Sequence, residues 1–270
     1  MKKIIWIFVL FYDLLMCPIT FAADTSQPIL LKNINQFKDF NKIGHVTYDK
    51  DYYQQGACYD TRRDRILLGV VKDGIKKQKI LVVNPHNFAI DKEYDFSNIG
   101  HMNTMTYCTN DDMIYVFTQL TDDGKHVANA SNIVVLDAKT LSTNRKIKLE
   151  QKIDAIDYDR KRKQFVAVRC NPDKEPFTLY IYDRNFKLKE TKKILKPFKT
   201  VGNGLAVNNG RFIHMSWAGM IEGNTSGHII KLIPVNFPKE EPEDAFWIEN
   251  KCFFVRPVGT GCTEVYVMDN

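Results

Sequence analysis

The chain has 270 residues, of which 44 % are hydrophobic and 26 % are charged, and its formal net charge is +6. The positive charge is spread over short runs such as KKQK, RKRK and KLKETKK, with no aromatic-interleaved nucleic-acid motif beside them. These features exclude nucleic acid as the expected partner and leave anionic polymers as the class that such loops meet.

The first 22 residues are predicted to be a signal peptide. Two lysines follow Met1, an apolar run extends from Ile4 to Cys17, and a small residue, Ala22, offers a cleavage point. The apolar run is too short to span a bilayer, although an uncleaved anchor is the alternative. Met16 and Pro18 around Cys17 argue against a lipoprotein. We therefore expect residues 23–270 to form one exported domain, secreted or periplasmic, with no membrane span and a net charge of +5 after loss of Lys2, Lys3 and Asp13.

Five segments of the mature chain resemble one another, and each reads as a strand, a polar turn and a second strand. A third apolar run, ended by Asn or Asp, follows each of them, as in KILVVNP and NIVVLDA. Units of 40 to 50 residues with three or four strands are typical of propeller blades. The five segments are QGACYDTRRDRILLGVV from residue 55, NTMTYCTNDDMIYVFTQ from 103, DAIDYDRKRKQFVAVRC from 154, NGLAVNNGRFIHMSW from 203 and EDAFWIENKCFFVRP from 243.

Fourth strands are expected at KEYDFSN, NRKIKLE and LKETKKIL. The fourth unit leaves little room for one, because only FPKEEP separates its third run, IKLIPVN, from the next unit. That blade is therefore expected to have three strands, or the register there differs. No segment has a sustained helical period of apolar residues, so few helices are expected.

The expected fold is all-β, a five-bladed β-propeller closed by pairing of N- and C-terminal strands. The chain reaches its end directly after the third run of the fifth unit, and an open blade edge invites aggregation. Residues 27–46 are predicted to supply the missing outer strand. A β-sandwich or an open solenoid is the alternative.

The residue that opens each inner strand carries a side-chain oxygen. Two carboxylates and three amides at one channel mouth suit calcium or another divalent cation, which takes 6 to 8 oxygen ligands. A water-filled polar ring without metal is the alternative. His101 lies beside this ring and is a candidate proton carrier. The five residues are Gln55, Asn103, Asp154, Asn203 and Glu243.

Two stretches, GNGLAV followed by NGRFIHMSW, and EDAFWIENKCFFV, resemble blade openings of the gluconolactonase, regucalcin and strictosidine-synthase-like propellers. The resemblance implies a divalent cation in the channel that activates substrate or water in lactone hydrolysis. Glu243 and Asn203 match the family's ligands best, whereas Asn103 and Asp154 match by blade position. Three departures stand against it: five blades where the family has six, Asp244-Ala245 where it has Gly-Pro, and Gln55 at a blade opening.

Five cysteines remain after residue 22, and no CxxC or Cys/His spacing indicates zinc. Cys252 and Cys262 flank FFVRPVGTG, where a hairpin would place them opposite one another as a disulfide pair. The remaining cysteines are expected to be small buried hydrophobes.

No G-x-S-x-G, H-E-x-x-H or glycine-rich phosphate loop is present. The function expected from the sequence is therefore a binding module that recognises an envelope glycopolymer, a small ligand or a protein through its channel-mouth loops. A divalent-cation-dependent hydrolase of lactonase or esterase type is the alternative.

Overall fold

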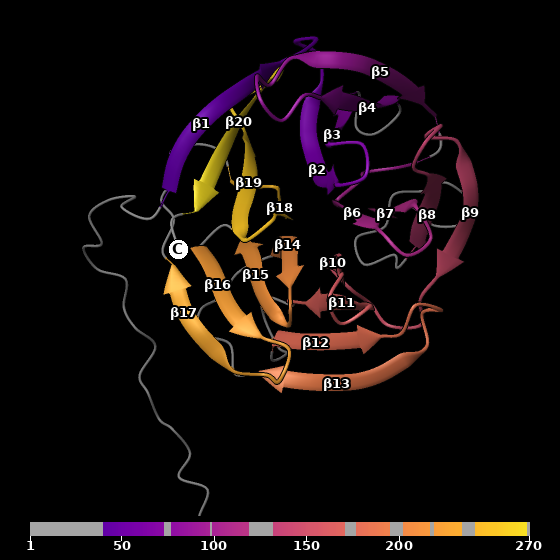
Figure 1. The fold of residues 1–270 in the computed structure, drawn as a ribbon, viewed down its shortest axis with the longest axis vertical. Coiled ribbons are helices and arrows are strands. Elements are labelled where there is room, and N and C mark those ends of the chain that lie inside the picture. Colours follow the sequence, from indigo (N-terminus) through magenta and orange to yellow (C-terminus); the bar gives the residue numbers. More distant parts are fainter. Residues whose placement is uncertain are drawn as a thin grey trace, which may run out of the picture. The chain divides into compact units, whose positions relative to one another are not determined.

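The computed structural model describes residues 40–72, 77–97, 99–118, 132–170, 177–194, 202–216, 219–233 and 241–268. These residues form twenty strands in five four-stranded antiparallel sheets and no helix. The sheets are arranged around a common axis as the blades of a propeller (Figure 1). The all-β, five-bladed fold is therefore confirmed. The predicted signal peptide lies outside the described residues.

Each blade runs from an inner strand at the axis to an outer strand at the rim (Figure 1). Blade 1 consists of β2 (Tyr53–Asp60), β3 (Arg65–Lys72), β4 (Lys77–Val83) and β5 (Ile90–Phe96). Blade 2 consists of β6 (Thr104–Cys108), β7 (Met113–Thr118), β8 (Asn132–Asp137) and β9 (Thr143–Lys148). Blade 3 consists of β10 (Ala155–Asp159), β11 (Gln164–Arg169), β12 (Phe177–Tyr182) and β13 (Leu188–Ile194).

Blade 4 consists of β14 (Gly202–Asn208), β15 (Arg211–Ser216), β16 (Gly219–Asn224) and β17 (Ile229–Ile233). The blade has four strands, so the expectation of three was wrong and the alternative, a different register, holds. The run IKLIPVN is the fourth strand rather than the third, and GMIEGN, which reads as a loop because it holds two glycines and a glutamate, pairs with β15 as the third. Gly223 is required in that strand because a Cβ there would lie 2.5 Å from the Phe212 ring.

Blade 5 is closed by the N-terminal strand, as predicted. It holds β18 (Asp244–Ile248), β19 (Lys251–Pro257), β20 (Cys262–Met268) and, outermost, β1 (Phe40–Thr47). β1 pairs antiparallel with β20 from Phe40↔Met268 to Thr47↔Cys262. The buried Phe40 ring lies edge-on to Phe254, with ring centroids 5.1 Å apart. Hydrogen bonds and apolar burial therefore join the two distant parts of the chain.

The turns after the third strands of blades 1 to 4 repeat one device. The Asn or Asp that ends each apolar run accepts a hydrogen bond from the backbone N–H two residues later, which defines an Asx turn. In blades 1 to 3 this confirms the reading of KILVVNP, NIVVLDA and LYIYDRN as strands leading into turns, whereas in blade 4 the turn follows GMIEGN and not IKLIPVN. The four residues are Asn84, Asp137, Asp183 and Asn224.

The core lies between the blades, because each sheet presents apolar side chains on both faces. Between blades 2 and 3, for example, the buried Tyr115, Tyr158 and Phe165 pack together, with ring centroids 4.8 Å and 4.9 Å from that of Phe165. The inner strands of all neighbouring blades are in contact, including β18 with β2, so the ring is closed.

The register of blade 5 does not bring Cys252 and Cys262 together. Cys252 is the second residue of β19, next to Phe253, which lies opposite Val267. Cys262 begins β20 at the other end of this strand pair, next to Thr263, which lies opposite Pro257. Both cysteines are free thiols. The error came from treating the segment between them as a tight hairpin turn, whereas most of it is β19 itself.

Removal of β1 tests the closure. A chain that starts at Tyr48 leaves β20 with an unpaired edge and exposes the site of Phe40, so we expect it to lose cooperative unfolding or to aggregate. A chain that starts at Leu31 keeps β1 and is the control. Urea unfolding followed by far-UV circular dichroism makes the comparison. Equal midpoints for the two chains would contradict a closing role for β1.

Candidate functional site

The five residues predicted to form a polar ring all lie at the starts of inner strands, at one end of the channel. In two of them the side-chain oxygen already lies within hydrogen-bonding distance of another protein group. The carboxylate of Asp154 accepts from Arg169 at 2.6 Å and from the backbone N–H of Cys170. The amide oxygen of Asn103 lies 3.0 Å from Nδ1 of His101.

The other three residues make different contacts. Gln55 and Asn203 donate through their amide nitrogens to backbone carbonyls, those of Gln54 at 3.0 Å and Pro242 at 3.3 Å. Glu243 is largely buried, and its backbone N–H donates to the carbonyl of Val255 at 3.1 Å. Within the described part of the chain, no group of three or more His, Cys, Asp or Glu side chains has a metal-binding arrangement. Calcium binding here, and a proton-transfer role for His101, remain predictions.

A cavity of about 40 Å³ lies toward the ends of the same strands. All five inner strands or the turns that follow them contribute to its wall, so it lies on the propeller axis. Its lining residues are Cys58, Tyr59, Thr106, Tyr107, Asp157, Tyr158, Arg160, Val207, Asn208, Phe246, Trp247 and Glu249. We call it the axial pocket.

Two tyrosines of the pocket wall are each held by an aspartate five residues later. The hydroxyl of Tyr59 donates to Asp64 at 2.6 Å, and that of Tyr107 donates to Asp112 at 2.8 Å. Both aspartates have positive φ, 47° and 60°, in the tight turn after the inner strand. The turn geometry therefore sets the orientation of the tyrosine. Burial, and after it the hydrogen bond to Asp64, raises the pKa of Tyr59 to about 12, so its hydroxyl stays protonated.

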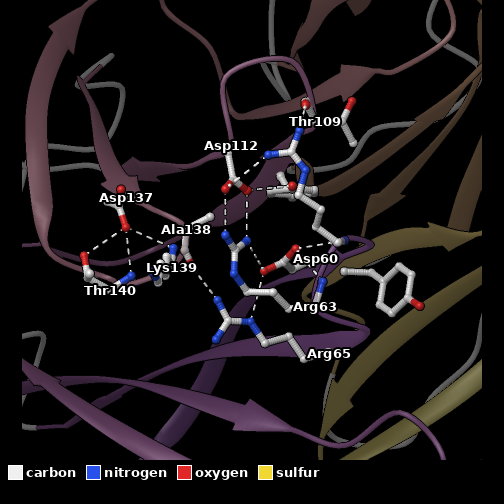
Figure 2. Close-up of polar contacts among 12 residues, drawn as sticks. Asp60, Arg63, Arg65, Thr109, Asp112, Asp137, Ala138, Lys139 and Thr140 are labelled. Carbon is white, nitrogen blue, oxygen red and sulfur yellow. Dashed lines mark hydrogen bonds and ion pairs between the residues drawn. The ribbon is translucent and has the colours of Figure 1, made fainter.

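Asp112 is itself fixed by the neighbouring blade (Figure 2). Arg63 donates to its two oxygens at 2.9 Å and 2.6 Å, a bidentate pair, and these bonds hold the pKa of Asp112 well below its usual range. Arg63 also donates to the fully buried Asp60 at 3.0 Å, and Arg65 donates to the same Asp60 oxygen at 3.0 Å. Figure 2 shows Arg63 between the two carboxylates. These bonds join the turns of blades 1 and 2 next to Tyr107, which lines the axial pocket.

Asp157 provides the pocket's carboxyl group. It accepts hydrogen bonds from the hydroxyl of Thr106 in blade 2, from the backbone N–H of Val207 in blade 4 at 2.6 Å, and from that of Tyr158 at 2.8 Å. One side chain therefore connects three blades. Burial raises its pKa to about 7, against the lowering effect of these donors and of Arg160.

A second acid, Asp244, lies closer to the strand starts and is fully buried. One of its oxygens accepts from the backbone N–H groups of Ala57 at 2.8 Å and Met105 at 3.1 Å, in blades 1 and 2. Burial raises its pKa well above the usual range. Gly204 makes room for it, because a Cβ there would lie 2.5 Å from the Cα of Asp244. This close contact explains the glycine of the Asn203-Gly204 opening of β14.

The pocket mouth is crossed by backbone-anchored side chains. Arg160 of blade 3 donates to the carbonyl of Tyr59 in blade 1 at 3.2 Å, and Asn208 donates to the carbonyl of Glu249 at 3.3 Å. The lining therefore includes one cation, Arg160, one amide, Asn208, and a second acid, Glu249. Rings of Tyr107, Phe246 and Trp247 also line the pocket.

The sequence reasoning missed Asp157 and Asp244. Both interrupt otherwise apolar inner strands, AIDY and EDAF, and an acid with no charged partner in such a strand was the available signal. In blade 5 the polar-ring residue was instead predicted at Glu243, one residue before Asp244. The Tyr-x-x-x-x-Asp spacing shared by Tyr59–Asp64 and Tyr107–Asp112 was a second signal.

Comparison with known proteins supports a propeller family. The family model described as methylamine dehydrogenase heavy chain (MADH) matches residues 33–206. No curated protein matches the chain. The propeller resemblance is thus confirmed, through a family other than the lactonase-type one that the sequence suggested.

Two solved structures have similar folds. Myxococcus xanthus glutaminyl cyclase matches with a TM-score of 0.60 at 11 % identity, over 86 % of this chain and 97 % of that one. The tail fibre of Staphylococcus aureus phage P68 matches with a TM-score of 0.58 at 12 % identity, over 85 % of this chain. This chain spans 52 % of the tail-fibre chain. Identities this low show the fold alone.

The pH dependence of stability tests the environment of Asp157. An acid whose folded pKa of about 7 exceeds its ordinary value of 3.8 destabilises the fold as pH rises between these values. Asp157→Asn removes this contribution. The variant should therefore gain roughly 1–3 kcal/mol relative to wild type between pH 4 and pH 8 in urea unfolding. Asp95→Asn, at an exposed rim position, is the control. A difference between Asp157→Asn and wild type that does not change with pH would contradict the assignment.

The calcium prediction has its own test. Calcium should raise the Tm of the purified protein by about 2 °C or more, and a chelator should reverse the rise. Glu243→Gln should abolish the response. Elemental analysis without bound metal, together with an unchanged Tm, would rule out the site.

Proposed function

The chain belongs to the methylamine dehydrogenase heavy chain family, and on this premise we propose that it is an exported propeller that acts as a binding module. The family takes its name from the heavy chain of a dehydrogenase, which is one subunit and not the complete enzyme. A rigid ring that presents a pocket to a partner suits such a role.

The axial pocket is the observation that carries the proposal, because residues from all five blades converge on it. Its volume of about 40 Å³ holds a few water-sized groups, since one water needs roughly 10–15 Å³ by this measure. A whole sugar or side chain is larger than that. The pocket therefore receives a small polar group of a larger partner, and the rest of the partner lies over the mouth.

The chemistry of the pocket defines the group that it accepts. Its lining offers hydrogen-bonding residues, among them Asp157 and two tyrosines, and two residues of opposite charge, Arg160 and Glu249. Aromatic rings beside polar groups are typical of sites that hold an amphipathic ligand in one orientation. A hydroxyl- or amine-bearing end of an envelope molecule fits this set. The glycopolymer, small-ligand and protein partners predicted from the sequence all carry such ends.

The proposed location is the periplasm or the exterior of the cell. The predicted signal peptide at residues 1–22 and membership of a periplasmic family support it. Among the described residues there is no helix long and apolar enough to cross a membrane. The divalent-cation-dependent hydrolase depends on calcium at the strand starts, so the calcium titration above tests that alternative.

A substitution that fills the mouth tests the binding role. Asn208→Trp places a large ring over the axial pocket, while Asn185→Trp puts the same ring on an exposed turn of blade 3. Each immobilised protein is incubated with a solubilised envelope fraction in about 1 M salt, which screens contacts with exposed surface charges, and the retained molecules are identified by mass spectrometry. Wild type and Asn185→Trp should retain the same molecules, and Asn208→Trp should lose them. Retention by Asn208→Trp, or by none of the three proteins, would overturn the proposal.

A further inference from the structure

The outer strands of the first three blades occupy equivalent positions but differ in charge. β5 carries three acids, Asp91, Glu93 and Asp95, and one lysine. β9 carries three cations and no acid, in the sequence TNRKIK. β13 carries three lysines and one glutamate, in the sequence LKETKKI. The fold tolerates either sign at this position, so the positive charge of β9 and β13 is not a structural requirement.

The six cations of these two strands form a surface that we call the basic rim. All except Lys192 are well exposed, and Lys192 pairs with Glu190 on its own strand at 2.9 Å. β9 and β13 follow one another along the outer edge of the propeller, in blades 2 and 3 (Figure 1). The six residues are Arg145, Lys146 and Lys148 of β9 and Lys189, Lys192 and Lys193 of β13.

We propose that the basic rim docks a linear acidic polysaccharide. Adjacent strand residues point to opposite faces, so Lys146 and Arg145, like Lys192 and Lys193, offer charge on both sides of the outer strand. A flexible chain that follows the edge reaches both sides. Five of the six cations are exposed, which favours multivalent contact with many anionic groups over one tight ion pair.

The shape of the rim separates this partner from other polyanions. The edge curves from β9 to β13 (Figure 1), so a flat bilayer touches only one blade at a time. Of the large apolar side chains that the described residues expose, only Leu188 belongs to the basic rim's strands, and one such residue is a weak membrane anchor. An acidic polysaccharide also fits the proposed location outside the cytoplasm, on which this inference rests.

Charge reversal at matched positions tests the docking surface. Lys146→Glu combined with Lys193→Glu changes the basic rim, and Lys77→Glu combined with Lys92→Glu changes the net charge equally in blade 1. Binding of polygalacturonate to the full mature chain is measured by calorimetry, with dextran as the neutral polymer. The rim variant should bind about tenfold or more weakly, the blade 1 variant within about twofold of wild type, and binding should weaken as salt rises. Dextran should not bind.

Three outcomes would overturn the proposal. They are no binding of polygalacturonate by wild type, an equal loss in both charge-reversal variants, and tighter binding of phosphatidylglycerol-containing vesicles or duplex DNA to the same rim. Asn208→Trp should leave polygalacturonate binding unchanged. Failure of rim binding while Asn208→Trp still loses the envelope ligand would remove this inference alone, and the reverse result would remove only the axial-pocket proposal.

Discussion

The innermost strand of each blade has one edge with no neighbouring strand, and its backbone N–H groups need acceptors at the crowded centre of the ring. Two aspartates and two threonines supply them. Asp244 accepts from Ala57 and Met105, and Asp157 accepts from Val207. The hydroxyls of Thr104 and Thr106 accept from the N–H groups of Ile156 and Tyr158. Each of these bonds joins two different blades. The bonds that give the inner-strand N–H groups their acceptors therefore also hold the ring closed.

The same solution places two carboxyl groups in poorly solvated surroundings and raises the pKa of both. It also constrains nearby positions, because Gly204 must lack a side chain where Asp244 approaches. Beyond Asp157 the strands diverge into turns held by the Arg63–Asp112 and Tyr59–Asp64 contacts, and the space left there is the axial pocket. The proposed binding site is thus the continuation of the network that holds the blades together. Its charge responds near neutral pH because burial raises the pKa of Asp157 to about 7.

The blade repeat, the closing strand and the Asx turns could be predicted because each has a local pattern: alternating apolar runs, a terminal Asn or Asp, and a spare N-terminal segment. Blade 4 was misread because Gly219–Asn224 has a single β-branched residue, Ile221, between two glycines, whereas its counterparts have two or three. The polar ring was predicted at strand starts because acceptors recur there, among them Gln55 and Asn103. Asp157 and Asp244 were missed because their roles depend on N–H groups of other blades, about 50 to 190 residues away along the chain. No local pattern encodes such partners.

Hydrogen exchange at individual amides tests the central claim most directly. The N–H groups of Ala57 and Met105 have the Asp244 carboxylate as acceptor, so in the wild-type protein they should exchange as slowly as the ladder amides of β3 and β7. In Asp244→Ala, which removes the acceptor oxygen, these two amides should lose protection selectively, while Asp95→Ala should leave them unchanged. Wild-type exchange of Ala57 and Met105 at the rate of exposed amides would contradict the account.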